Sequence, residues 1–406
     1  KLAWHVRTHY SDKCEIVTLP QAPGISIVRK ADRQTAWLPK QEPQVLKQGS
    51  CSGASDSSAP SFPLNSIPPF LRVPQPPPVI PNIHVIFVVQ PPWWASAFFR
   101  GSQFVRSLSA VPGFTMELKT TPEFTTVERR DGMELFCVFV KAWDPEAAGR
   151  CRAAGGIVVW DFVDSAADIS HVESYKEADV IIVGSRPHQL ISYQYFPDQK
   201  IWYLPHHHNN WNSRRKDVSQ PVRTVGVHGY YTNALSESDE EILITCAMEL
   251  DLEFVVIPFD SNLSHIEDFS AAEAELDQRV STVIDQLLKL DVLVIFPGPF
   301  PDNTQQTHSK IRLKPVTRAA LAWSLGLPTI MYPYASYLEA AVHVGYPAFA
   351  TEMYEICDIL SELVHSEDRR RDLSQRGPEL ARPLSLEALT SVYASLFRDF
   401  ERHEEP

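Results

Sequence analysis

Four basic side chains surround the start of one apolar stretch, KPVTRAALAWSLGLPTIMYP at 314–333. They are Lys310, Arg312, Lys314 and Arg318. The apolar spacing after Lys314 predicts a helix. Basic groups at a helix N-terminus oppose the helix dipole, so an unliganded protein gains nothing from them. Backbone N–H groups at a helix start, together with cations, bind phosphate. The stretch therefore predicts an anion site, and exposed charges on an ordinary helix start are the alternative.

Two other positions could contact the same anion or the group attached to it. Gly229 follows the expected strand RTVGVHG, where a glycine lets the backbone approach a ligand closely. A plain turn capped by Asn233 or Ser236 is the alternative. Ser336 and Glu339 open the helix expected after PTIMYP, and their spacing matches a capping box. The Glu339 carboxylate is equally placed to accept hydrogen bonds from ribose hydroxyls.

Candidate bases lie in the run PHHHNN at 205–210 and at the end of the expected strand IVVWD. In an extended chain His206 and His208 face one way, so we expect a hinge loop that exposes histidines to a cleft. Solvated hinge residues without a role are the alternative. Asp161 and Asp164 could activate an acceptor hydroxyl, although aspartates at strand ends are often helix caps.

Aromatic side chains follow the expected strand 83–89. Trp93 and Trp94 could stack on a sugar face, and Arg100 would suit a polar or anionic acceptor. Core packing is the alternative for such aromatic residues.

Strands rich in β-branched and aromatic residues alternate with helical segments from residue 82 onward. This alternation predicts a parallel α/β sheet, and the pattern begins again near residue 222. We therefore expect two doubly wound halves, 82–210 and 211–406, with a helix over 383–402 that could pack on either half. Ligands of such sheets bind beyond the carboxyl ends of the strands. The expected strands include 83–89, 134–142, 157–163, 178–185, 201–204, 223–227, 252–259, 291–296 and 328–333.

Residues 1–81 differ in composition from the rest of the chain. They contain KQGSCSGASDSSAPSFP and PPFLRVPQPPPVIP. Serine, glycine and proline at this density bury too little apolar area to offset the entropy of ordering. We expect a disordered Pro/Ser-rich region, with a linker over about residues 40–81.

Composition and missing motifs exclude several classes of protein. With 37 basic and 50 acidic side chains the net charge is −13, which argues against nucleic-acid binding. No stretch has the length of apolar sequence that crosses a bilayer. The absence of GxGxxG, Walker A, GxSxG, HExxH and Asp-x-Asp patterns favours a mechanism without a metal or other cofactor. Six scattered cysteines favour the cytoplasm, while a secretory-pathway lumen stays open because an N-terminal anchor could precede Lys1.

The two Rossmann-like halves, the segment YLPHHHNN and the stretch KPVTRAALAWSLGLPTIMYPYASYLEA resemble a GT-B fold glycosyltransferase of the retaining, family 4-like group. In that family a hinge motif with a proline precedes the donor domain, whose first strand is followed by a glycine loop. The chain departs from the family at Met331, which stands where the first of two glutamates spaced eight apart would be. The resemblance implies that Glu339 holds the donor ribose. It implies that the donor diphosphate is bound by Gly229, Arg312, Lys314 and Arg318.

We therefore expect transfer of a sugar from a nucleoside-diphosphate sugar to a glycan or small-molecule acceptor, without a metal. A histidine of the pair His206 and His208, or Asp161, would assist the acceptor hydroxyl. Trp93, Trp94 and Arg100 would bind the acceptor. The alternatives are a two-lobed binding or scaffold protein without catalysis, and a nucleotide-sugar epimerase.

Overall fold

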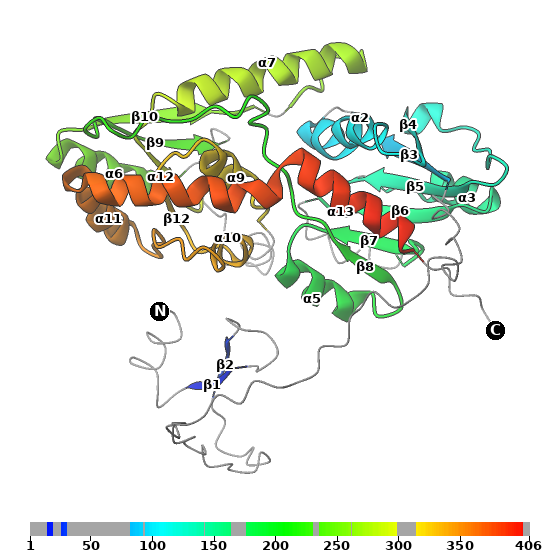
Figure 1. Cartoon of the computed structure of the whole chain (residues 1–406), viewed down its shortest axis with the longest axis horizontal. Coiled ribbons are helices and arrows are strands. Elements are labelled where there is room, and N and C mark those ends of the chain that lie inside the picture. The colour runs from blue at the N-terminus through cyan, green and yellow to red at the C-terminus, as the bar shows by residue number, and fades with distance from the viewer. Residues whose placement is uncertain are drawn as a thin grey trace, which may run out of the picture. The chain divides into compact units, whose positions relative to one another are not determined.

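The computed structural model describes residues 14–18, 26–30 and 82–400, apart from 92–93, 142, 164–175, 230–234, 261 and 299–313. The chain forms two compact units, residues 1–79 and 80–406. In the first unit, β1 (Cys14–Thr18) and β2 (Ser26–Lys30) pair as an antiparallel hairpin (Figure 1). The composition of residues 1–81 gave no indication of this hairpin. The disordered linker expected over 40–81 lies outside the described residues.

The second unit contains two parallel sheets. The first has six strands in the order β4-β3-β5-β6-β7-β8, so β3 pairs with β4 on one side and with β5 on the other. From β3 the chain passes first to β4 on one side and then to β5 on the other, which makes the carboxyl ends of β3 and β5 a switch point where ligands bind in such folds. The strands are β3 (Ile83–Val89), β4 (Phe114–Thr120), β5 (Glu134–Val140), β6 (Ile157–Asp161), β7 (Val180–Val183) and β8 (Lys200–Tyr203). The helices are η2 (Ala97–Ser102, a π-helical turn), α2 (Gln103–Leu108), η3 (Thr121–Glu123), α3 (Pro145–Ala153) and α5 (Arg186–Tyr195).

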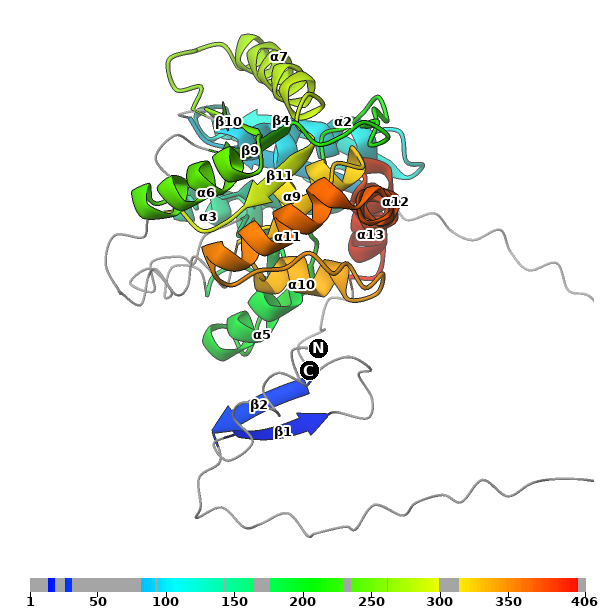
Figure 2. The ribbon, with the colours of Figure 1, turned by 90° about the vertical axis from the view of Figure 1, so that its left-hand side faces the viewer.

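The second sheet has four strands in the order β10-β9-β11-β12, again with the first strand of the sheet in the interior. Helices α6 (Glu237–Glu249) and α7 (Phe269–Leu287) lie on opposite faces of this sheet (Figure 2). The strands are β9 (Thr224–Gly229), β10 (Glu253–Pro258), β11 (Val292–Ile295) and β12 (Thr329–Met331). The helices are α6 (Glu237–Glu249), α7 (Phe269–Leu287), α9 (Thr317–Ser324), α10 (Ala335–Ala341), α11 (Met353–His365) and α12 (Glu367–Ala381).

These two sheets confirm the α/β fold of two doubly wound halves expected from the alternation of strands and helices. Strand β4 was not expected, because its sequence FTMELKT mixes apolar and polar residues, and every one of them is partly exposed. Ser236 caps α6, as its spacing indicated, and accepts a hydrogen bond from Asp239 N. The domain boundary near residue 210 stays a prediction.

The last helix, α13 (Leu386–Arg398), follows the short turn η5 (Arg382–Leu384) and lies along the six-stranded sheet (Figure 1). Its fully buried Phe397 ring lies 4.9 Å from that of Phe136 on β5 and 5.5 Å from that of Trp202 on β8, measured between ring centroids. The helix expected over 383–402 is therefore present, and it packs on the N-terminal half.

Truncation of the Phe397 side chain tests the packing of α13 on the six-stranded sheet. Phe397→Ala should lower the free energy of unfolding by about 3–5 kcal/mol, because it removes a buried ring and leaves a cavity. Val392→Ala on the exposed side of the same helix should change it by about 0.5 kcal/mol or less. Urea denaturation followed by circular dichroism measures both values. Equal small effects would mean that α13 does not pack in this way.

Candidate functional site

A pocket of about 210 Å³ lies at the carboxyl end of β9 and the start of α9. It is called the α9 pocket below. Because β9 pairs with β10 on one side and β11 on the other, this is the switch point of the second sheet. Apolar side chains such as Phe99, Phe259 and Leu321 form part of its wall. Its polar lining includes Asn209, His228, Gly229, Lys314, Thr317 and Arg318.

The structure brings together three of the residues predicted to bind a diphosphate. A Cβ atom on Gly229 would lie 2.9 Å from Nη1 and 3.0 Å from Cζ of Arg318. Any other side chain at Gly229 would therefore displace the guanidinium group, and glycine is what lets Arg318 lie over the end of β9. Lys314 lines the same pocket. Arg312 lies outside the described residues.

No side chain of the described residues caps the start of α9. Val316 at the N-cap makes no side-chain capping bond, and the first turn contains no acidic residue. Pro315 directly precedes the N-cap. Within the part of the chain that the structure describes, no carboxylate lies within ion-pair distance of Arg318. The helix dipole and Arg318 therefore place positive potential in the pocket, which suits a phosphate group.

The prediction that Ser336 and Glu339 form a capping box is wrong. Helix α10 begins at Ala335 after the N-cap Tyr334, and the Ser336 hydroxyl instead donates to the Lys314 carbonyl. The Glu339 carboxylate accepts a hydrogen bond from the Arg186 backbone N–H at 2.9 Å, at the start of α5. Burial raises the pKa of Glu339 despite this bond. Glu339 thus joins the two halves, and its expected contact with ribose stays a prediction.

His228 is a buried histidine of the α9 pocket that the sequence analysis did not select. Its Nδ1–H donates to the Ile257 carbonyl at 3.2 Å. Burial, assisted by the nearby charge of Arg318, lowers the pKa of His228 to about 4. The imidazole is therefore neutral at pH 7 and does not compete with Arg318 for a bound anion.

The expectation that the histidines of PHHHNN are exposed to a cleft is wrong for His206 and His207, while His208 is half-buried. His206 and His207 are buried, and their Nε2 atoms lie 3.0 Å from the Val163 carbonyl and 2.7 Å from the Phe99 carbonyl. Burial lowers the pKa of both His207 and His208 to about 4, so they are neutral at pH 7. No histidine of this run is among the described residues that line the α9 pocket.

Arg100 and Asp161 form a buried ion pair. Arg100 Nε donates to Asp161 Oδ2 at 2.8 Å, and each side chain is 1% exposed. Arg100 Nη1 also donates to the carbonyls of Leu204 and Pro205, at 3.4 Å and 3.0 Å. Neither side chain reaches solvent, so the structure corrects the expectation that Arg100 binds an acceptor and Asp161 acts as a base. Asp164 lies outside the described residues.

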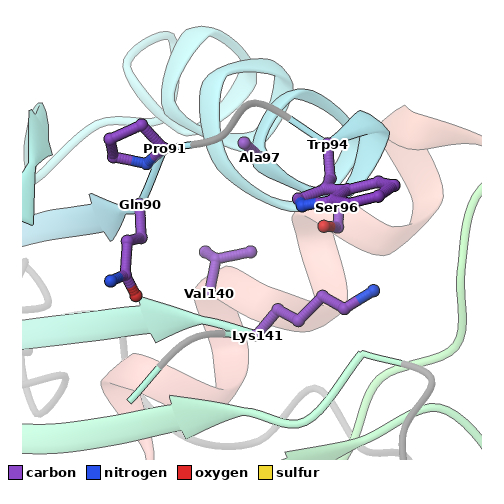
Figure 3. A pocket seen from close by; sticks show the side chains of 7 residues that line it. All are labelled: Gln90, Pro91, Trp94, Ser96, Ala97, Val140 and Lys141. Atoms are coloured by element: carbon purple, nitrogen blue, oxygen red, sulfur yellow. The ribbon is translucent and has the colours of Figure 1, made fainter. Parts of the chain in front are cut away.

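A second pocket, of about 320 Å³, lies at the switch point of the first sheet and is called the β3–β5 pocket (Figure 3). Figure 3 shows the Trp94 ring and the Lys141 side chain along one side of it and Gln90 along the other. Trp94 is 41% exposed, and its expected contact with an acceptor stays a prediction. Lys141 has a φ of 64°, an unusual conformation for a residue with a side chain that is often found at functional sites. Trp93 lies outside the described residues.

The π-helical turn η2 belongs to the first half, and its side chains contact both halves. Phe98 stacks on Phe269 of α7 with ring centroids 4.7 Å apart, Phe99 lines the α9 pocket, and Arg100 enters the core. A π turn holds one extra residue, which redirects the side chains that follow, and such turns are frequent at functional sites. The apolar run AFFRG carries no sequence signal for this geometry, which explains why Phe99 was not selected.

Two negative findings apply to the described residues alone. Among them, no group of three or more His, Cys, Asp and Glu side chains is placed to hold a metal ion. No described helix has the length and apolar character needed to cross a bilayer.

The two-sheet architecture is that of glycosyltransferases with the GT-B fold. No protein-family model matches the sequence, and a search of curated proteins finds no match. A glycosyltransferase from Rickettsia africae superposes with a TM-score of 0.52 at 8% identity, covering 78% of this chain and 98% of its own. HepE from Anabaena, crystallised with UDP and glucose, superposes with a TM-score of 0.50 at 10% identity, covering 78% of this chain and 99% of its own. These similarities confirm the GT-B fold that the sequence resembled.

Removal of the Asp161 charge distinguishes a structural role of the buried Arg100–Asp161 pair from a catalytic role of Asp161. Asp161→Asn should lower the free energy of unfolding by about 3–5 kcal/mol, because Arg100 would remain buried without a counter-charge. Arg371→Gln, which breaks an exposed ion pair with Glu367, should change it by about 0.5 kcal/mol or less. Chemical denaturation measures both. A stable Asp161→Asn variant that had lost activity would instead support the catalytic role expected from the sequence.

Stability should depend on pH through the buried histidines. The pKa of His207 falls from its ordinary 6.5 to about 4 on folding, so the unfolded chain binds more protons between these values. The free energy of unfolding should therefore decrease as the pH is lowered from 6.5 to 4, by up to about 3 kcal/mol for this residue.

The matched variants are His207→Gln, which keeps a donor for the Phe99 carbonyl, and His265→Gln on an exposed loop. The Tm is measured by thermal unfolding from pH 7 to pH 4.5. It should fall less over this range in His207→Gln than in wild type or His265→Gln. Three parallel profiles would contradict the assignment.

Proposed function

We propose that the protein transfers a sugar from a nucleoside-diphosphate sugar to an acceptor hydroxyl. The observation that carries this proposal is the convergence of Gly229, Lys314 and Arg318 at the start of α9, at the switch point of the second sheet. The GT-B fold gives independent support, and the structure of HepE with UDP and glucose gives an example of such ligands on this fold.

In this proposal the diphosphate of the donor occupies the α9 pocket. Negative charge develops on the diphosphate as its bond to the sugar breaks. Lys314, Arg318 and the dipole of α9 stabilise that charge, and they are held in place before the reaction, so little reorganisation is needed. The same groups neutralise the diphosphate without a metal, and we include independence of metals and other cofactors in the proposal.

The acceptor occupies the β3–β5 pocket in this proposal. Trp94 offers a partly exposed aromatic face to a sugar ring, and the Gln90 amide offers hydrogen bonds to its hydroxyls. A glycan or a small molecule with a similar polar ring fits these groups.

A second candidate function is nucleotide-sugar binding without transfer. The burial of His206 and of the Arg100–Asp161 pair favours it, since these groups already serve the fold. Release of nucleoside diphosphate from a nucleotide sugar, measured with a mixture of glycan acceptors, separates the two functions. Tight binding with no release under any acceptor would favour the binding protein.

The donor site is tested by a thermal-shift screen of UDP, GDP, ADP and CMP, each with and without EDTA. One nucleoside diphosphate should raise the Tm of the wild type, and EDTA should not reduce the shift. Lys314→Ala and Arg318→Ala should each weaken its binding roughly 10- to 100-fold, the value of a hydrogen bond to a charged group. The control is Lys289→Ala, an exposed lysine at the opposite, amino end of β11. If no nucleotide stabilised the wild type, the proposed donor site would be wrong.

A further inference from the structure

Two adjacent asparagines at the junction of the two halves have opposite hydrogen-bonding states. The Asn210 amide is satisfied: Nδ2 donates to the carbonyls of Arg214 and Ser324 at 3.0 Å and 3.1 Å, and Oδ1 accepts from Arg214 N at 3.0 Å. Asn209 is 6% exposed, and among the described residues its Oδ1 has no donor. A buried amide oxygen without a partner is unfavourable, so this exception needs a reason.

Asn209 lines the α9 pocket, in the same cavity as Lys314 and Arg318. Its backbone is fixed, since the neighbouring His208 N–H donates to the Leu384 carbonyl at 3.0 Å and Asn210 is anchored on both sides. The backbone of Asn209 is therefore held beside the pocket. Its Oδ1 is covered in the ligand-free chain, and a turn of the amide group about its side-chain bonds would bring it to a ligand in the pocket.

The amide oxygen of Asn209 determines which chemical group could be its missing hydrogen-bond partner. The oxygen needs a donor, and the bridging diphosphate of a nucleotide sugar has no proton to give at pH 7. A hydroxyl group donates to Oδ1, and it also accepts from Nδ2 if the amide is turned over, so it fits either orientation. The apolar rings of Phe99 and Phe259 in the same wall suit the carbon face of a sugar ring.

We propose that Asn209 binds a hydroxyl of the transferred sugar. This inference rests on the proposed function, because it requires the diphosphate to lie at Lys314 and Arg318. The ribose also carries hydroxyls. However, Asn209 and Phe99 come from the junction and the first half, toward which the transferred sugar must point to meet the acceptor.

The test compares each nucleotide sugar with its nucleoside diphosphate. Calorimetric titration of UDP-glucose, ADP-glucose and GDP-mannose, each beside UDP, ADP or GDP, is carried out on wild type and on Asn209→Leu. The variant should bind the best nucleotide sugar about tenfold more weakly and its nucleoside diphosphate equally well. Its Tm without ligand should be equal to or above that of the wild type, because a buried unsatisfied oxygen is removed.

Gln103→Leu is the matched control, because Gln103 is also buried with an unpartnered amide oxygen but does not line the pocket. It should leave both affinities unchanged. An analogue of the sugar in which the contacted hydroxyl is replaced by hydrogen should bind wild type more weakly, and the Asn209→Leu variant should not distinguish it from the parent sugar.

Three results would overturn the inference. Equal weakening of the nucleotide sugar and of the nucleoside diphosphate would assign Asn209 to the nucleoside. Unchanged binding of both would leave Asn209 without a role in the site. If the wild type bound none of these ligands, the proposed function would fail together with the inference. If the wild type and Asn209→Leu bound them equally well, the inference alone would fail.

Discussion

The ion pair between Arg100 and Asp161 fixes the junction between the two halves. Arg100 ties the carboxyl end of β6 to the carbonyls of Leu204 and Pro205, where the chain leaves the six-stranded sheet. A buried charge pair is tolerated only when the remaining hydrogen-bonding capacity is also satisfied, and here backbone carbonyls satisfy it. From this point the chain runs through the interior, which sets the positions of His206, His207 and finally Asn209. One wall of the α9 pocket thus depends on a contact made in the core of the other half.

The electrostatics of the chain differ between its surface and this pocket. A net charge of −13 repels anions at long range. In the α9 pocket Arg318 has no carboxylate within ion-pair distance among the described residues, the neighbouring His228 is neutral, and the first turn of α9 has no acidic residue. A phosphate group therefore gains its stabilisation at short range, where salt screens the interaction least. This arrangement favours a small anion that fits the pocket over an extended polyanion.

Much of the fold was predictable, since buried parallel strands such as NIHVIFVVQ and DVLVIFP are continuous apolar runs between helical segments. The joint location of Gly229, Lys314 and Arg318 was predictable too, because strand ends and a helix start fall on one edge of a sheet. The sequence could not show whether a polar residue near a strand end faces a pocket or the core. Arg100, Asp161 and His206 were therefore assigned to ligands, although tertiary packing buries them. Asn209 was missed for the same reason, because its unsatisfied state depends on what surrounds it.

The chain passes between the two halves twice, once through the segment after β8 and again through η5 before α13. The two passages are in direct contact, since the His208 N–H donates to the carbonyl of Leu384 at 3.0 Å. A single flexible connection would let one half twist freely against the other. Two connections that are bonded to each other restrict the twisting of one half against the other. The position of the segment that carries Asn209 in the α9 pocket therefore also depends on the residues just before α13, which lie more than 170 positions later in the chain.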